Sequence, residues 1–152
     1  MPRLRKTSGS GGGGSNYGVI LDGSARITSA SGGVSVTGTG GTGGSGNIGI
    51  SMSAGTKIET TGAAGIMLTG NRGGGVLFNW GVVLSGATVR TTAAGAIQIV
   101  GGGPAAVTGS DNYGIIIGSA TVVESPDAIT LIGTGGNGTD SNHGVWISGA
   151  GT

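Results

Sequence analysis

The sequence contains no cysteine among its 152 residues, and it has a single histidine. Disulfide bonds, thiolate metal sites and histidine clusters for zinc are therefore excluded. Charged residues make up 9% of the chain and the formal net charge is +1, so the basic surface that nucleic-acid binding requires is missing. No apolar run approaches the roughly 18 residues of a membrane-spanning helix. We expect no metal, no cofactor, no nucleic-acid partner and no membrane insertion.

Glycine is the abundant residue, at 39 of 152 positions, and aromatic residues make up only 3%. The glycines follow no G-X-Y period, which excludes collagen, and disordered chains are usually far more charged. Residues 1–15 differ from the rest, with a basic start followed by a Gly/Ser tract. No apolar stretch of a signal peptide follows this start. We interpret residues 1–15 as a disordered leader.

The triplet Asn-x-Gly recurs five times, and the spacings between successive Asn residues are 31, 32, 33 and 30. The copies are Asn16-Tyr17-Gly18, Asn47-Ile48-Gly49, Asn79-Trp80-Gly81, Asn112-Tyr113-Gly114 and Asn142-His143-Gly144. Such a period is typical of repeat proteins whose units stack on their neighbours. Residues 16–152 are therefore predicted to form four repeats and a truncated fifth, as a segment of a longer array.

Apolar residues occupy matching positions in every repeat, and three short strands per repeat follow from them. The first strand carries Val19 and Leu21, matched by Ile50 and Met52, Val82 and Leu84, Ile115 and Ile117, and Val145 and Ile147. The second strand is marked by Ile27, Ile58, Val89 and Val122. The third carries Val34 and Val36, Ile66 and Leu68, Ile97 and Ile99, and Ile129 and Leu131. Pairs two residues apart share one face of a strand, so the residues between them are expected outside.

This pattern predicts an all-β fold, a parallel β-helix or β-solenoid in which each unit of about 31 residues is one rung of three strands. The alternative is an antiparallel sandwich or a blade-like array. It fits less well, because the pattern repeats by the rung and not by the hairpin.

The Asn column (Asn16, Asn47, Asn79, Asn112, Asn142) has two structural interpretations. Asn tolerates turn geometry and so marks corners, or its stacked amides bond one another as a ladder along the axis. The Gly column (Gly18, Gly49, Gly81, Gly114, Gly144) should face outward if Val19 faces inward. Absence of a side chain there indicates a bulge or a close approach of the Gly-rich loop.

The middle residue of the triplet is aromatic at Tyr17, Trp80 and Tyr113. Together with Trp146, which falls in an outward column, these residues are the candidates for ligand binding, because aromatic columns can bind sugar rings. Period two places Tyr17, Trp80 and Tyr113 on the side of Val19, inward or at a corner, and Ile48 interrupts the column. Packing at a corner is the alternative interpretation.

The acidic residues do not form a catalytic pattern. Only Glu124 and Asp127 are close in sequence, and the turn around Pro126 explains both. Glycoside cleavage needs two carboxylates across a bond. The Gly-rich loops lack the Lys-Ser/Thr ending of a phosphate-binding loop. The chain is therefore expected not to be an enzyme, and no catalytic residue is assigned.

Three blocks, residues 16–21, 129–142 and 143–149, resemble the β-strand repeats of very large bacterial exoproteins, the filamentous-haemagglutinin-like and autotransporter-like surface proteins. The resemblance covers about residues 16–152. It implies a right-handed β-helical stalk that is exported and displayed on, or released from, a Gram-negative-type cell surface. It transfers no catalytic residues.

Three functions follow as expectations. The first is a non-catalytic structural or adhesive stalk, whose partners are neighbouring rungs of a longer array, a second copy end to end, or host and matrix glycans. The second is a β-helix that binds or cleaves polysaccharide. The third is a flat-face module of the ice-binding kind, which needs an outward Thr array on every rung. Here Thr60-Thr61 and Thr91-Thr92 align, but the other rungs break the array.

Overall fold

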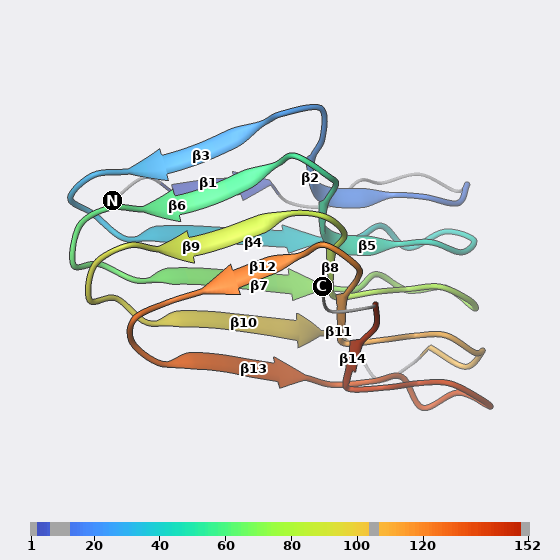
Figure 1. Cartoon of the computed structure of the whole chain (residues 1–152). Helices are drawn as coiled ribbons and strands as arrows, with labels where there is room; N and C mark the ends of the chain where they lie inside the picture. Colours follow the sequence, from blue (N-terminus) through green and yellow to red (C-terminus); the bar gives the residue numbers. More distant parts are fainter. Residues whose placement is uncertain (1–2, 7–12, 104–106, 150–152) are drawn as a thin grey trace.

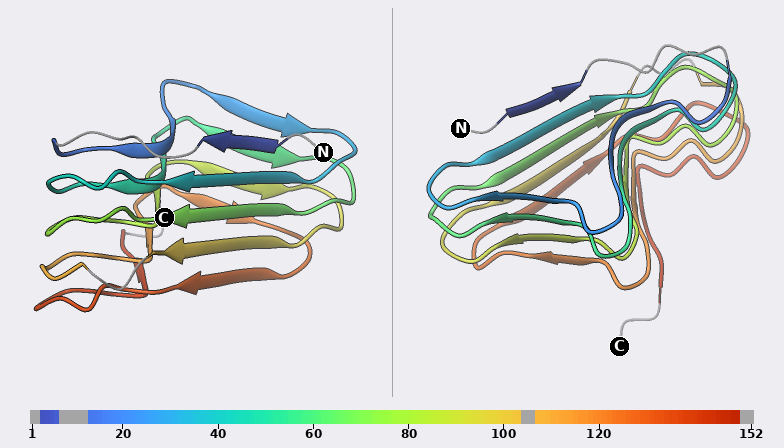
Figure 2. Two further views of the ribbon diagram at one scale, coloured as in Figure 1. Left: turned by 180° about the vertical axis from the view of Figure 1, so that it is seen from behind. Right: turned by 90° about the horizontal axis from the view of Figure 1, so that it is seen from above.

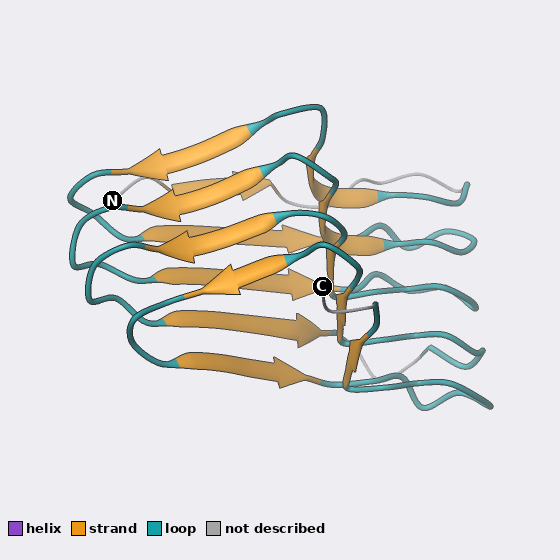
Figure 3. Cartoon of the chain, in the orientation of Figure 1, coloured by secondary structure: helices purple, strands orange, loops and turns teal. Residues whose placement is uncertain are grey.

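The computed structural model describes residues 3–6, 13–103 and 107–149, and strands are the only regular elements in these ranges (Figure 3). The first strands of successive rungs are β2 (Tyr17–Leu21), β5 (Ile48–Met52), β8 (Val82–Leu84), β11 (Ile115–Ile117) and β14 (Val145–Ile147). The second strands are β3 (Arg26–Ser29), β6 (Lys57–Thr60), β9 (Thr88–Thr91) and β12 (Val122–Glu124). The third strands are β4 (Val34–Thr39), β7 (Ile66–Asn71), β10 (Ile97–Gly102) and β13 (Ile129–Gly133).

Each class of strand forms its own parallel sheet. The first sheet has the order β14-β11-β8-β5-β2, the second β12-β9-β6-β3, and the third β1-β4-β7-β10-β13. Every strand therefore pairs with its counterpart one rung away, as Figure 1 shows. The predicted parallel β-solenoid with three strands per rung is confirmed, and the antiparallel alternative is wrong. Seen from above, the chain runs clockwise while successive rungs recede, so the coil is right-handed (Figure 2).

The third sheet begins with β1 (Arg3–Lys6), which pairs in parallel with β4. The expectation of a disordered leader is therefore wrong for residues 3–6. The reason is that β4 would otherwise present an open edge of backbone N–H and C=O groups, which any extended segment can pair with. Residues 1–2 and 7–12 of the leader lie outside the described residues.

Apolar columns fill the space between the three sheets. Val19, Ile50, Val82, Ile115 and Val145 are in register along the first sheet, as are Val34, Ile66, Ile97 and Ile129 along the third. In the inner rungs these side chains are fully buried, whereas the outward Ile20 is 53% exposed. In the last rung Val145 is 37% exposed, because β14 is the edge strand of its sheet.

The second sheet corrects one prediction. Val123, and not Val122, pairs with Val89 and packs against the core, and Val122 is exposed. The turn before β9 has three residues (85–87), whereas the turns before β3, β6 and β12 have four (22–25, 53–56 and 118–121). The short turn shifts the alignment by one residue between the third and fourth rungs. Such a slip exchanges the faces of a strand.

The loops from the third sheet back to the first project from one corner and stack as a separate lobe (Figures 1 and 2). We call residues 40–47, 72–81, 103–114 and 134–144 the lobe, of which 104–106 lie outside the described part. The lobe carries the Asn of the triplet in every rung after the first, and the candidate site lies there and along the adjoining corner.

Candidate functional site

The five Asn side chains of the triplets stand one above another at the base of the lobe. Amide Nδ2 of one residue donates to Oδ1 of the next from Asn16 to Asn47 (2.8 Å), from Asn47 to Asn79 (2.9 Å) and from Asn79 to Asn112 (2.9 Å). Oδ1 of Asn79 and Oδ1 of Asn112 also accept the backbone N–H of the Asn one rung earlier, and Oδ1 of Asn142 accepts that of Asn112 at 3.0 Å. Asn47, Asn79 and Asn112 are completely buried.

These amides also bond the carbonyls of the lobe. Nδ2 of Asn47 donates to Gly43 and Gly74, and Nδ2 of Asn112 donates to Val76 and Gly109. These four carbonyls of the lobe loops thereby gain hydrogen-bond partners without a continuous strand. The Asn column thus has a structural role of the ladder kind.

A left-handed residue precedes each Asn. Those residues are Ser15 (φ 63°), Gly46 (77°), Phe78 (57°), Asp111 (58°) and Ser141 (49°). Only glycine adopts this conformation without strain, and other residues lose roughly 1–2 kcal/mol there. The same conformation therefore recurs in every rung despite four different residue types. No residue type marks this position, so sequence reasoning missed it.

Arg72 is a buried cation in the lobe, with 0% exposure. Its Nη1 donates to the carbonyl of Thr134 (2.6 Å) and its Nη2 to that of Gly135 (3.1 Å), both two rungs away in sequence. Burial lowers the pKa of this guanidinium. Arg72 therefore fastens distant lobe loops to one another. No other repeat has an arginine at this place, so the repeat pattern gave no signal for it.

The Gly column was predicted to face outward. In the structure it faces inward, onto the ends of the third strands. A Cβ on Gly49 would lie 2.5 Å from the backbone N of Asn71 and 2.6 Å from the carbonyl O of Gly81. The chain turns at this corner from the lobe into the first sheet (Figure 2), and the backbone bends at the matching Gly81, Gly114 and Gly144. The bend restarts the alternation of side chains, so counting back one residue from Val19 to Gly18 gives the wrong face.

The aromatic column lies at this corner, one of the two placements that the sequence left open. Trp80 and Tyr113 share a stack there with the outward Trp146. The rings of Trp80 and Tyr113 stack within 7° of parallel at 6.4 Å between centroids, and Tyr113 packs on Trp146 at 5.4 Å. His143 continues the stack at 5.3 Å from Tyr113. Ile116, predicted outside, is 7% exposed because its register partner Trp146 packs on Tyr113 beside it.

Polar contacts fix the stacked rings. The indole N–H of Trp80 donates to the Asp111 carbonyl (2.7 Å), and the Tyr113 hydroxyl donates to the Asp111 carboxylate (2.8 Å). Burial, with the carboxylate of Asp111, raises the pKa of the Tyr113 phenol. Tyr113 is 8% exposed, so it supports the neighbouring rings and is not itself open to a ligand.

One open hollow lies on this column, and its volume is about 350 Å³. We call it the Ile48 groove, and its lining residues are Ser15, Tyr17, Ser45, Gly46, Ile48, Phe78 and Trp80. Phe78 crosses Trp80 at 75° with 6.2 Å between centroids. The groove therefore has aromatic walls from rungs one and three around the single aliphatic member of the column. Of the predicted ligand-binding candidates, Tyr17 and Trp80 meet here, whereas Tyr113 and Trp146 do not.

The carboxylates are scattered or already paired. On the second sheet, Oε1 of Glu59 lies 2.7 Å from Nζ of Lys57 and 2.6 Å from Nη2 of Arg90. Hydrogen bonds from these two cations lower the pKa of Glu59. A carboxyl group with a lowered pKa is a poor proton donor. Asp127 bonds the Ala128 amide within its turn. In the described part of the chain, no group of three or more His, Cys, Asp or Glu side chains could hold a metal ion.

Only one threonine of each pair faces the surface, Thr61 and Thr92. Thr60 and Thr91 are buried, and each hydroxyl donates to a carbonyl four residues ahead, of Ala64 and Gly95. These threonines therefore close corners between the second and third sheets.

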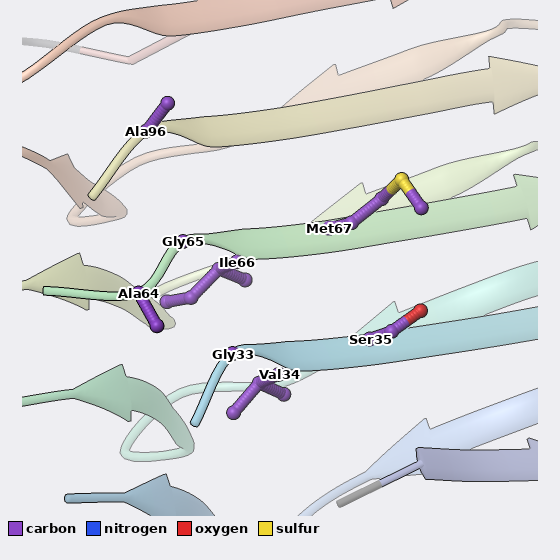
Figure 4. A pocket seen from close by; sticks show the side chains of 8 residues that line it. All are labelled: Gly33, Val34, Ser35, Ala64, Gly65, Ile66, Met67 and Ala96. Atoms are coloured by element: carbon purple, nitrogen blue, oxygen red, sulfur yellow. The ribbon is translucent and has the colours of Figure 1, made fainter. Parts of the chain in front are cut away.

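A further hollow, with a volume of about 330 Å³, lies where the third sheet begins (Figure 4). Small residues such as Gly65 and Ala96 line it, while Met67 points away from the core side chains Val34 and Ile66. Ser35 is its only polar side chain, so it offers little chemistry.

Comparison with protein-family models, with curated proteins and with solved structures gave no match for this chain. Over the described residues, no helix has the length and apolar character to cross a membrane. The function must therefore be argued from the site itself.

Proposed function

We propose that this chain is a non-catalytic structural and adhesive stalk segment of a bacterial surface or secreted exoprotein. The observation that carries the proposal is that the buried polar side chains bond groups in other rungs. Asn79 bonds the Asn residues of both adjacent rungs, Glu59 bonds Arg90 of the next rung, and Arg72 joins loops two rungs apart. These groups hold rungs together, and their engagement in such bonds supports a structural role.

The partners in this proposal are further rungs or a second copy stacked end to end. β14 is an edge strand, and Val145 and Ile147 are 37% and 65% exposed on it. Open edges with apolar columns recruit further strands. Sedimentation over a concentration series should show association that increases with concentration. A monomer at hundreds of micromolar would contradict this part of the proposal.

The adhesive part can be tested with beads that carry the purified chain. Beads with the folded chain should be retained on surfaces coated with host or matrix glycans, and beads with the core variant Ile99→Asp should be washed away. Equal retention of both would contradict adhesion by the folded stalk. Soluble polysaccharides should release no reducing ends in parallel assays, and their release by the folded chain would overturn the non-catalytic part.

Binding of polysaccharide is the second candidate, and the Ile48 groove favours it because two aromatic side chains flank an open space there. Cleavage has no comparable support, because Glu59 is held charged by Lys57 and Arg90. The ice-binding alternative is not favoured either, since Thr60 and Thr91 are buried.

A further inference from the structure

The aromatic column lacks one ring. Tyr17 in the first rung is in register with Ile48 in the second. The backbone N–H of Gly49 donates to the carbonyl of Trp80, which places Trp80 in the same column one rung further. Ile48 is 5% exposed, and its side chain reaches less far from the backbone than an aromatic ring does, so the open space lies over it. The Ile48 groove therefore coincides with the rung at which the stack of rings is interrupted.

The indole ring of Trp80 is oriented so that one of its two faces forms a wall of the Ile48 groove. Tyr113 lies one rung beyond Trp80, and the two rings are nearly parallel. One face of the indole is therefore turned toward Tyr113 and the other toward the rung of Ile48. The hydrogen bond from its Nε1 to Asp111 holds the indole in this position. The wall of the groove is thus a fixed ring rather than a mobile one.

The height of the gap suits one ring. Residues two rungs apart in one column are about 9.6 Å apart, given about 4.8 Å per rung. A ring stacked between two others needs about 7–8 Å, from two contacts of about 3.5–4.0 Å each. Beyond the Ile48 side chain, where the rings of Tyr17 and Trp80 extend further from the backbone, this spacing admits one ring with two apolar faces and not two.

The rim of the groove is polar. Ser15 and Ser45 line it, and within the described residues neither hydroxyl makes a hydrogen bond. The occupant should therefore combine apolar faces with hydroxyl groups around its edge. A hexopyranose whose substituents are all equatorial has this form, because only C–H groups point from its two faces. An axial hydroxyl, as in galactose or mannose, makes one face polar.

We propose that the Ile48 groove binds one gluco-configured pyranose ring, which takes the place of the missing aromatic ring between Tyr17 and Trp80. The inference rests on the adhesive part of the proposed function and names the glycan class that the stalk recognises. Discrimination against galacto- and manno-configured sugars follows from desolvating an axial hydroxyl against a ring face.

The test is a titration of the ¹⁵N-labelled Trp146→Phe chain, in which Trp80 is the only indole, since the sequence has two tryptophans. Methyl β-D-glucopyranoside should shift the Trp80 indole N–H signal with half-saturation on the order of millimolar, as expected for a single small ring. Methyl β-D-galactopyranoside and methyl α-D-mannopyranoside should need at least about tenfold more, a difference of about 1.4 kcal/mol.

The decisive variant is Ile48→Tyr, which completes the stack with a residue type that other rungs already carry. It should weaken glucoside binding at least about tenfold while the circular dichroism spectrum and Tm show a folded chain. The same change at the exposed Ile20, which does not line the groove, should leave binding unchanged. If Ile48→Tyr does not fold, Trp80→Phe provides a second test. Isothermal titration calorimetry, which needs no tryptophan signal, should then show weaker glucoside binding.

Three results would overturn the inference: no shift of the Trp80 signal, equal shifts with all three sugars, or unchanged binding by folded Ile48→Tyr. Loss of self-association in Ile48→Tyr, without any sugar effect, would also overturn it and assign the groove to a second copy. Bead retention separates the two proposals. Retention that survives Ile48→Tyr leaves the stalk function standing without this site, whereas sugar binding without retention rejects the adhesive function alone.

Discussion

The three-sheet core and the lobe stack with the same period but are held together differently. In the core, Ile50 and Ile99 are fully buried in apolar columns, and their strands β5 and β10 each pair with both neighbouring strands through the backbone. In the lobe, Asn47 and Asn79 supply side-chain amides where the strands have ended. A coil can therefore keep its rungs in register beyond its sheets when buried side-chain amides replace the backbone hydrogen bonds between strands.

The core should be the most sensitive part of the molecule. Ile99→Asp places an unpaired carboxylate among apolar side chains and should cost more than about 4 kcal/mol, which unfolds the coil. Gln98→Asp, on the outer face of the same strand, should stay within about 0.5 kcal/mol. Thermal melts of the two variants measure the difference. Equal sensitivity would mean that β10 does not have the assigned inner and outer faces.

The lobe should lose stability through a single amide. Asn79→Ala removes the acceptor of the Asn47 amides and the donor to Asn112, which leaves buried groups unsatisfied. We expect a loss of about 2–4 kcal/mol, measured by denaturant unfolding. Asn16→Ala, at the less buried end of the ladder, should cost about 1 kcal/mol or less. Equal losses would show that burial does not set the strength of the ladder.

Much of the core could be predicted from the sequence, whereas the lobe could not. Period two and the repeat length place Val82 and Ile97 correctly, because each position recurs in every rung. Val122 was placed wrongly, since one shortened turn shifts the alignment by a residue. The sequence left the aromatic column either inward or at a corner, because the backbone bends at glycines such as Gly81 and Gly114 and the alternation does not extend across the bend.

Two kinds of feature could not be predicted from the sequence: a residue that occurs in one repeat only, and a backbone conformation that different residue types adopt. Arg72 belongs to one loop only, so no matching residue in the other repeats indicates its role. Phe78 and Asp111 share the left-handed conformation of Gly46, but neither is a residue type that marks it. The site therefore depends on backbone geometry that repeats without a repeated residue.

The second cross-rung link of the lobe can be broken without touching the ladder. Arg72→Ala removes the donors to the carbonyls of Thr134 and Gly135 and leaves a cavity, so a loss of about 2 kcal/mol is expected. Chemical denaturation of the variant gives the value. A change below about 0.5 kcal/mol would mean that water replaces the guanidinium at no cost.

The smallest effect is expected on the outer face of the second sheet. The pKa of Glu59 is lowered by Lys57 and Arg90, so its contribution is present above the unfolded-state pKa of about 4.3 and disappears as the pH falls through the lower folded-state value. The Tm of the unmodified chain should exceed that of Glu59→Gln slightly at pH 7 and equal it at low pH. A Tm difference that grows on acidification would contradict the ion pairs.

Amide hydrogen exchange of the unmodified chain and of Asn79→Ala tests most directly whether the lobe is held by its ladder apart from the core. The backbone N–H of Asn47 donates to Oδ1 of Asn79, while that of Ile50 donates to the Gly81 carbonyl in the adjoining sheet. In Asn79→Ala, the Asn47 amide should exchange rapidly while the Ile50 amide stays protected. Loss of protection at both amides together, or at neither, would contradict this account.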